Sequence, residues 1–212
     1  MYIPEAFRVD DPEVLHALIR SHPLGTVITS GIGGLQAAPL PFLFDAAEGR
    51  HGTLRAHLAR ANPLIDALRG CAECLVLFHG PQGYVSPSWY PSKQQHHKVA
   101  PTWNYAMVQA RGRATVIDDA AWLREQIAAL TAEHEAHRDA PWSPDDAPAD
   151  FIAGMIAGIA GIEIAIEALD GKFKLSQNRG RADRDGVIEA LGSPDDPHRH
   201  PELATLMQGL TT

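Results

Sequence analysis

The residues between His79 and Tyr105 have types and spacing that suit recognition of a flat, polar ring. This stretch holds Trp89 and Trp103, two of the four tryptophans in the chain, together with Tyr90. Rings of this kind offer flat apolar surface to a fused aromatic ligand. Further side chains in the same stretch could hydrogen-bond ring carbonyls and ring nitrogens, namely Ser86, Thr102 and Asn104.

Cationic side chains that could meet a phosphate group accompany this stretch. Arginine is favoured for such a contact because its planar fork can grip two phosphate oxygens at once. The alternative is that the aromatic residues close a protein core and the cations are ordinary surface charge. Composition does not separate these interpretations, and the candidate cations are Arg60, Lys93, Lys98, Lys174 and Arg179.

Other kinds of catalytic or metal site find little support. The turn from Gly31 to Gly34 lacks the glycine spacing and the βαβ surroundings of a dinucleotide site. His134 and His137 are one residue too close for the helical zinc motif and are better explained as solvated histidines. Cys71 and Cys74 fall before and inside an expected strand, so we expect buried structural cysteines and no metal site.

Bulk properties indicate a globular chain with its own core. It has 212 residues, 45% of them apolar, and a formal net charge of −8. No apolar run approaches the roughly 18 residues of a membrane span, and the first residues do not resemble a signal peptide. We therefore expect a cytoplasmic protein with no membrane partner. The negative charge disfavours direct DNA binding unless a local basic patch exists.

The periodicity of the sequence predicts an antiparallel barrel with helical decorations. Short strands follow one another in hairpin order, and helices are inserted between some of them, which does not suit a parallel sheet. A long, proline-rich loop is expected between residues 79 and 105. Strands are expected over 24–29, 35–44, 53–58, 72–79, 105–118 and 161–167, the last extended or paired by 172–175. One helix is expected to begin at residue 12, and others are expected over 62–68, 119–137 and 149–159. Two more helices are expected within 183–210, and residues 140–148 are expected to form a proline-rich linker.

Several short segments, in the same order along the chain, make the sequence resemble a known family. Together they are specific, and they resemble the PaiB-type FMN-binding negative transcriptional regulators, a branch of the flavin-binding split-barrel proteins. The chain departs from the family pattern at Ala56, where glycine is usual, and at Leu64-Ile65, where bulkier residues are usual. The matching segments are Met1 to Pro4, Gly25 to Thr29, His57 to Pro63, Ser86 to Tyr90, Val99 to Tyr105 and Lys174 to Arg179.

The resemblance implies a split-barrel homodimer that holds FMN at the subunit interface. It implies a barrel domain over residues 1–175 and a C-terminal helical extension over 176–212 that packs on it. The segment from His57 would help to hold the phosphate, and the basic end of the last strand would approach the flavin. The cofactor contacts added in this way are His57, Ala59, Arg60, Asn62, Lys174, Gln177 and Arg179.

Membership of such a family leaves the function open, because one fold can host several functions. The first reading is a flavin-binding regulator, and the second is a flavin-dependent oxidoreductase of a small molecule. A structural dimer without flavin is the third. The best candidate for a basic DNA-binding face is Lys172 to Arg184, with five cations and one aspartate, but an indirect effect on transcription is preferred to direct operator binding.

Overall fold

The computed structural model describes residues 1–31, 33–70 and 73–209. The chain divides into two compact units that are interleaved along the sequence. The first unit contains Met1–Leu18, His79–Val108 and Asp170–Thr212, and the second contains Ile19–Phe78 and Gln109–Leu169. The predicted boundary at residues 175 and 176 remains a prediction.

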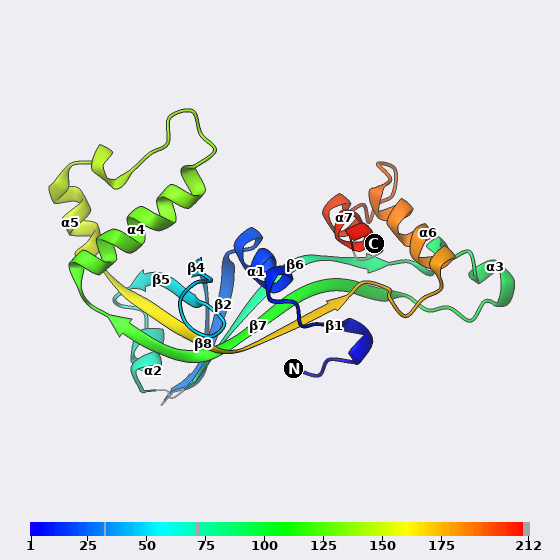
Figure 1. Cartoon of the computed structure of the whole chain (residues 1–212), viewed down its shortest axis with the longest axis horizontal. Coiled ribbons are helices and arrows are strands. Elements are labelled where there is room, and N and C mark those ends of the chain that lie inside the picture. The colour runs from blue at the N-terminus through cyan, green and yellow to red at the C-terminus, as the bar shows by residue number, and fades with distance from the viewer. Residues whose placement is uncertain (32, 71–72, 210–212) are drawn as a thin grey trace. The chain divides into compact units, whose positions relative to one another are not determined.

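The strands form an antiparallel sheet whose hydrogen-bonded order is β3-β2-β6-β7-β8-β5-β4, with β1 beside β8 (Figure 1). Three strands are long enough for parts of each to belong to both units, namely β6, β7 and β8. The bounds are β1 Arg8–Val9, β2 Leu24–Gly31, β3 Gly34–Pro41, β4 Leu43–Asp45, β5 Thr53–Ala59, β6 Cys74–Val85, β7 Thr102–Ile117 and β8 Ile159–Lys174.

Alternating side chains explain why the second unit forms a sheet with one buried face. Ile162, Ile164 and Ile166 alternate with exposed or partly exposed residues along β8, and all three are at most 2% exposed. Their partner β5 lies antiparallel, with Leu54 opposite Ile164. A period of two places every second residue on the same face. The alternation predicted from the sequence is therefore confirmed.

Helix α4 of the second unit begins at a side-chain cap. Asp119 accepts a hydrogen bond from the amide of Trp122 and so caps α4, Ala120–Glu135. The next helix, α5, covers Ala149–Ala157 and follows a short turn, η3, at Pro144–Asp146. Leu123 of α4 forms a small apolar cluster with Ile152 and Ile156 of α5. Leu64–Gly70 forms α2.

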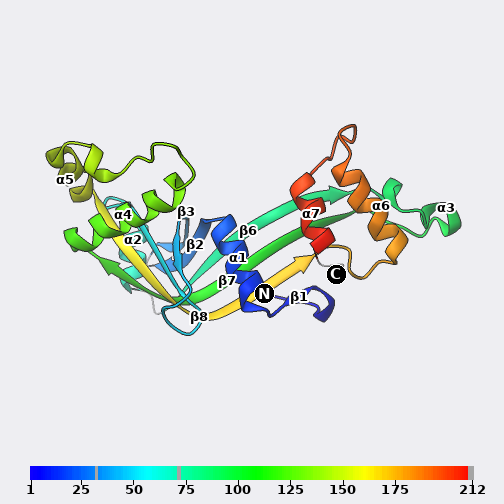
Figure 2. The same ribbon diagram turned by 45° about the horizontal axis from the view of Figure 1, so that its top comes forward.

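The first unit gathers both ends of the chain. In β1, Arg8 lies opposite Lys172 of β8. Figures 1 and 2 both show α6 and α7 side by side, in agreement with the buried positions of Leu191 and Leu203. The remaining helical segments with residues in this unit are η1 Glu5–Phe7, α1 Pro12–Ser21, η2 Pro87–Trp89, α3 Lys93–His96, α6 Arg181–Gly192 and α7 Pro201–Gly209.

Several sequence predictions need correction. The loop predicted for residues 79–105 is shorter, because β6 continues to Val85 and β7 already begins at Thr102. The prediction that residues 172–175 extend or pair with the strand over 161–167 is confirmed in its first form, because β8 runs continuously from Ile159 to Lys174. In α4 the buried positions are Leu123 and Gln126, whereas Trp122, Ile127 and Leu130 are only partly buried.

Cys74 is buried, and its Sγ lies 3.4 Å from the carbonyl oxygen of Gly112, which it can reach as a donor. Cys71 lies outside the described residues, as do Ile32 of the expected hairpin turn and Leu210 of the expected last helix. The turn itself closes at Gly34, whose φ of 95° is a backbone conformation that favours glycine.

Candidate functional site

The sequence-predicted cofactor contacts fall into both units. His57, Ala59, Arg60 and Asn62 belong to the second unit. The remaining nine belong to the first unit, where strands β6, β7 and β8 and the segments that follow them carry them. They are Ser86, Trp89, Tyr90, Thr102, Trp103, Asn104, Lys174, Gln177 and Arg179.

In the second unit, the predicted contacts surround the end of β5 and the start of α2. Ala59 is exposed at the last position of β5. Asn62 Oδ1 accepts a hydrogen bond of 3.0 Å from the amide of Leu64, which begins α2. The Nδ1 atom of His57 lies 2.7 Å from Gln126 Oε1. Local contacts therefore fix the orientation of both polar side chains.

Arg60 is held by contacts within its own unit. Its Nη2 donates to the carbonyl oxygen of Ile159 at 2.8 Å, and its Nε donates to that of Ala157 at 3.3 Å. Its Nη1 forms an ion pair with Asp118. The same carboxylate forms a second ion pair with Arg69, whose Nη2 lies 2.5 Å from it. The hydrogen bond from Arg60 is the main cause that holds the pKa of Asp118 below its usual value. Arg60 thus has a structural role here, and its phosphate contact stays a prediction.

In the first unit, residues near the C-terminus contact the aromatic side chains. Trp89 Nε1 donates to Asp196 Oδ2 at 2.9 Å. The ring of His198 lies 4.9 Å from the ring of Tyr84, and the ring of Trp103 meets that of Tyr84 edge-on at 6.4 Å. Trp103 nevertheless remains 48% exposed. Trp103 therefore keeps a large free surface, whereas the indole N–H of Trp89 is already used.

Tyr90 lies under an arginine. It is only 2% exposed, and the Cζ atom of Arg179 sits 4.9 Å from the centre of its ring. Burial raises the pKa of the Tyr90 hydroxyl, and the nearby charge of Arg179 partly opposes that shift. Ser86 precedes this pair and accepts a 3.2 Å hydrogen bond from the amide of Ser88, so it caps the short turn η2. Tyr90 is thus a core residue that positions Arg179.

Lys174 lies at the end of β8 among other cations. Its Nζ donates to Thr102 Oγ1 at 2.5 Å and to the carbonyl oxygen of Trp103 at 2.6 Å. Burial lowers the pKa of Lys174, and the charges of Lys172 and Arg179 lower it further. Among the described residues, none of these three cations forms an ion pair with a carboxylate. We call Lys172, Lys174 and Arg179 the cationic group, and it fits an anionic ligand because an anion would relieve this repulsion.

Asn104 and Gln177 hold the backbone around residue 176. Asn104 has no exposed surface, and its Nδ2 donates to Ser176 Oγ at 2.9 Å. Ser176 has a φ of 64°, in the left-handed region. Gln177 Oε1 accepts from the amide of Leu175 at 2.6 Å, and its Nε2 donates to the carbonyl oxygen of Phe173. Both amides shape the end of β8, and their direct contact with a flavin stays a prediction.

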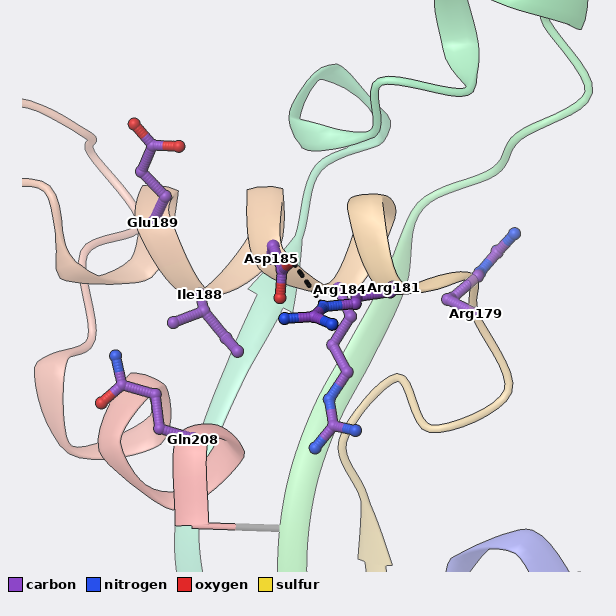
Figure 3. A pocket seen from close by; sticks show the side chains of 7 residues that line it. All are labelled: Arg179, Arg181, Arg184, Asp185, Ile188, Glu189 and Gln208. Atoms are coloured by element: carbon purple, nitrogen blue, oxygen red, sulfur yellow. Dashed lines mark ion pairs between the residues drawn. The ribbon is translucent and has the colours of Figure 1, made fainter. Parts of the chain in front are cut away.

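A cavity of about 700 Å³ lies beside α6 and has mixed charge (Figure 3). Arg181 Nε lies 3.7 Å from Asp185 Oδ2, and Arg184 Nη2 donates to the carbonyl oxygen of Met207 at 2.9 Å. In Figure 3 the side chain of Arg179 extends away from that of Arg184. Glu189 also lines the cavity. The arginines here do not converge on one point.

Several residues with defined roles were missed by sequence reasoning. Asp118 joins two arginines, and Asp183 accepts from both the amide and the hydroxyl of Ser92, at 3.0 and 2.7 Å. No local pattern marks these pairs, because their members lie far apart in the sequence. Gln126 could have been found, since it follows Trp122 by four residues and so shares its helical face.

Two further features are absent from the part of the chain that the structure describes. No set of three or more histidine, cysteine, aspartate or glutamate side chains is placed to hold a metal ion within residues 1–31, 33–70 and 73–209. In the same ranges, none of the helices has both the length and the apolar character needed to span a bilayer.

Comparison with known proteins gives matches over most of the chain. A family model described as "Putative FMN-binding domain" matches residues 1–168. The Bacillus subtilis (strain 168) protein named "Protease synthase and sporulation protein PAI 2" is 33% identical over 208 residues. That alignment covers 98% of this chain and 97% of the relative.

Solved structures agree on the fold. The flavocytochrome Anf3 from Azotobacter vinelandii has a TM-score of 0.58 at 18% identity, covering 79% of this chain and 69% of that one. The FAD and heme binding protein from Mycobacterium smegmatis has a TM-score of 0.56 at 22% identity, covering 79% and 73%. These likenesses confirm the predicted antiparallel split-barrel fold with C-terminal helices.

Proposed function

Because this chain belongs to the family of FMN-binding domains whose model matches residues 1–168, we propose that it is a flavin-binding regulator that signals through its bound FMN. FMN is the cofactor of the family. The likeness to a relative named for protease synthesis and sporulation supports the regulatory part of the proposal. The observation that carries it is the cationic group, which lacks carboxylate partners among the described residues.

We assign the phosphate contact to Lys174 in preference to Arg60. Arg60 already donates to two carbonyl oxygens and pairs with Asp118. Lys174 donates only to neutral oxygens, and burial, followed by the like charges of Lys172 and Arg179, lowers its pKa. An anion beside Lys174 would gain a charge-assisted hydrogen bond without displacing a carboxylate. The carbonyl oxygen of Trp103 accepts a hydrogen bond from this lysine, and the exposed ring of Trp103 would supply flat apolar surface to the flavin.

Signalling requires an element whose conformation the flavin can bias. The segment from Lys172 to Arg184 suits this role, because it contains the whole cationic group and the left-handed residue Ser176. Two of its other cations are engaged already, Arg181 with Asp185 and Arg184 with the carbonyl oxygen of Met207. We therefore favour an indirect effect on transcription over direct DNA binding by this segment. We also propose that the protein is a cytoplasmic homodimer.

Hydrogen exchange with and without FMN tests the regulatory proposal. We expect amides of residues 172–184 to gain protection when FMN is added, while amides in the buried strand β8 near Ile164 stay unchanged. The same protein is then mixed with NADH or NADPH under air, with dioxygen as the electron acceptor. Sustained nicotinamide oxidation without any change in residues 172–184 would replace the regulator with a flavin-dependent oxidoreductase.

Light scattering tests the proposed assembly separately. A homodimer with bound FMN is expected at micromolar protein concentration. A monomer that retains FMN would rule out a cofactor site shared between two copies. A colourless protein that does not bind added FMN would instead support a structural role without flavin.

A further inference from the structure

A cleft of about 370 Å³ in the second unit adjoins α4. Its volume is near the lower end of the range for small-molecule sites, about 300–1,000 Å³. Residues of α4 and of strands β4 and β5 line it. They are Leu43, Arg55, Trp122, Glu125, Gln126 and Ala129.

Gln126 lines this cleft and carries an unsatisfied hydrogen-bond donor. The residue is only 3% exposed, and its Oε1 is taken by His57 Nδ1 at 2.7 Å. Its Nε2 is buried and has no hydrogen-bond partner. A buried polar atom without a partner is unusual in a folded protein and is costly. With His57 Nδ1 next to Oε1, the amide atom left for a ligand is the Nε2 donor.

Trp122 supplies a fixed, flat wall. A Cβ atom added at Gly161 of β8 would lie 2.2 Å from Cζ3 of this indole, so the ring lies directly against the strand backbone. Trp122 is only partly buried, and it also packs on the cluster around Leu123. An indole held in this way can stack with a planar ligand ring.

The charges around the cleft select against anions. Arg55 is neutralised by three acids: its Nε lies 2.7 Å from Glu163, its Nη1 lies 3.6 Å from Asp45, and its Nη2 pairs with Glu48. Glu125 is a further acid in the lining. Four carboxylates thus accompany one guanidinium. A negatively charged ligand would meet net repulsion.

We propose that this α4 cleft binds a compact, neutral, planar ring that carries a carboxamide or lactam group. A small rotation of the Gln126 side chain into the cleft exposes Nε2, which then donates a hydrogen bond to the carbonyl oxygen of the ligand, and the ligand ring lies against Trp122. The inference concerns a second ligand and does not depend on the proposed regulatory function. Its test is accordingly carried out on full-length protein saturated with FMN.

Three probes of nearly equal shape separate the contributions to binding. Benzamide is neutral and offers the carbonyl acceptor, benzoate offers the acceptor with a negative charge, and benzamidinium has no acceptor. We expect benzamide to shift the side-chain amide signal of Gln126 and the indole N–H signal of Trp122 in NMR spectra. Saturation is expected at a dissociation constant on the order of 1 mM, as is usual for ligands of this size. The indole signal of Trp142, which is 45% exposed and does not line the cleft, serves as an internal control.

The order of affinities decides the proposal. Benzamide binding at least about fivefold more tightly than both other probes would support it, since one hydrogen bond corresponds to roughly that factor. Tighter binding of benzamidinium would mean that the acids dominate, and it would overturn the proposed ligand class. Absence of any saturable shift would mean that water alone occupies the cleft.

A variant pair adds an independent check. Gln126→Met keeps the side-chain size and removes the donor. It should weaken the binding of benzamide about fivefold and leave the affinity for benzamidinium unchanged. Gln109→Met is the matched control, because Gln109 is also buried at 8% exposure but does not line the cleft. If Gln126→Met does not fold, the order of the three probes on the unaltered protein still decides. Equal loss for all probes in Gln126→Met would contradict the proposed hydrogen bond.

Discussion

Asn104 of β7 donates a hydrogen bond of 2.9 Å to the hydroxyl of Ser176, 72 residues later in the sequence. Ser176 adopts a left-handed backbone conformation, with φ of 64°, shortly after the end of β8. For a residue other than glycine this conformation costs roughly 1–2 kcal/mol. The buried amide of Asn104 therefore helps to hold a strained residue between the last strand and α6.

Removal of this amide should destabilise the protein. We expect Asn104→Ala to lower the free energy of unfolding by about 1–3 kcal/mol, because Ser176 loses a buried partner. Urea unfolding followed by circular dichroism measures the difference. Asn178→Ala is the control, since Asn178 is exposed two residues further on and should change stability by less than about 0.5 kcal/mol. Equal effects of the two substitutions would contradict the role given to Asn104.

Lys174 should determine the preference for FMN over riboflavin. Lys174→Gln removes the charge, and we expect FMN binding to weaken by roughly 1.5–3 kcal/mol, the range for hydrogen bonds to charged groups. Riboflavin lacks the phosphate, so its binding should change little. Quenching of flavin fluorescence gives both affinities. Equal weakening of FMN and riboflavin would place the lysine against the ring and would refute the phosphate assignment.

The affinity for FMN should also depend on alkaline pH. The pKa of Lys174 lies below its ordinary value of 10.5, chiefly because of burial. A bound phosphate favours the protonated lysine, so binding is strongest below the pKa of Lys174 and weakens as the pH rises through it. Lys174→Arg retains its charge across this range and should lack the decline. Fluorescence titrations of both proteins between neutral and alkaline pH compare the two profiles.

The ion pair between Arg60 and Asp118 predicts how the titration of Asp118 responds to the loss of its arginine partner. We expect Arg60→Gln to raise the pKa of Asp118 toward its ordinary value of 3.8, because the first cause of its depression is lost. Stability contributed by this carboxylate is present above that ordinary value and disappears as the pH falls through the lower pKa of the folded state. Carbon NMR of the carboxylate measures the change. Arg124→Gln is the control, because Arg124 pairs with Asp145 instead.

Close packing between α6 and the turn at Trp89 predicts intolerance of a methyl group at Gly186. A Cβ atom there would lie 2.3 Å from the carbonyl oxygen of Trp89. Gly186→Ala should therefore lower the free energy of unfolding by about 1–3 kcal/mol. Gly192→Ala, in the last position of the same helix, meets no atom within 4 Å and should be neutral or slightly stabilising. Thermal unfolding of both variants provides the comparison.

Local periodicity allowed much of the fold to be predicted. The isoleucines at 162, 164 and 166 alternate so clearly that the buried face of β8 follows from sequence alone. The same reasoning failed at Gly80 and Pro81, which suggest a loop although β6 continues through them to Val85. Pairing with neighbouring strands outweighs local propensity there.

The candidate site shows the same limit. Trp103 and Lys174 could be identified as candidate ligand contacts from their side-chain chemistry, and both side chains remain partly accessible. The sequence could not reveal that Asn104 is fully buried against Ser176 or that Asp118 forms an ion pair with Arg60. The first contact joins residues 72 positions apart, and the second joins residues 58 positions apart. Such contacts depend on the strand order and not on nearby residues.

The interleaving of the two units has a consequence for biosynthesis. The first unit needs Met1–Leu18, His79–Val108 and Asp170–Thr212, so it cannot be complete until residues 170–212 have left the ribosome. Chains grow at roughly 5–20 residues per second, and N-terminal parts usually fold first. Here the second unit can form earlier, from residues 19–78 and 109–169. Lys174 and Arg179 are synthesised after it, so the proposed contact between Lys174 and FMN can form only after the second unit, and a chain truncated before Lys172 would lack the cationic group.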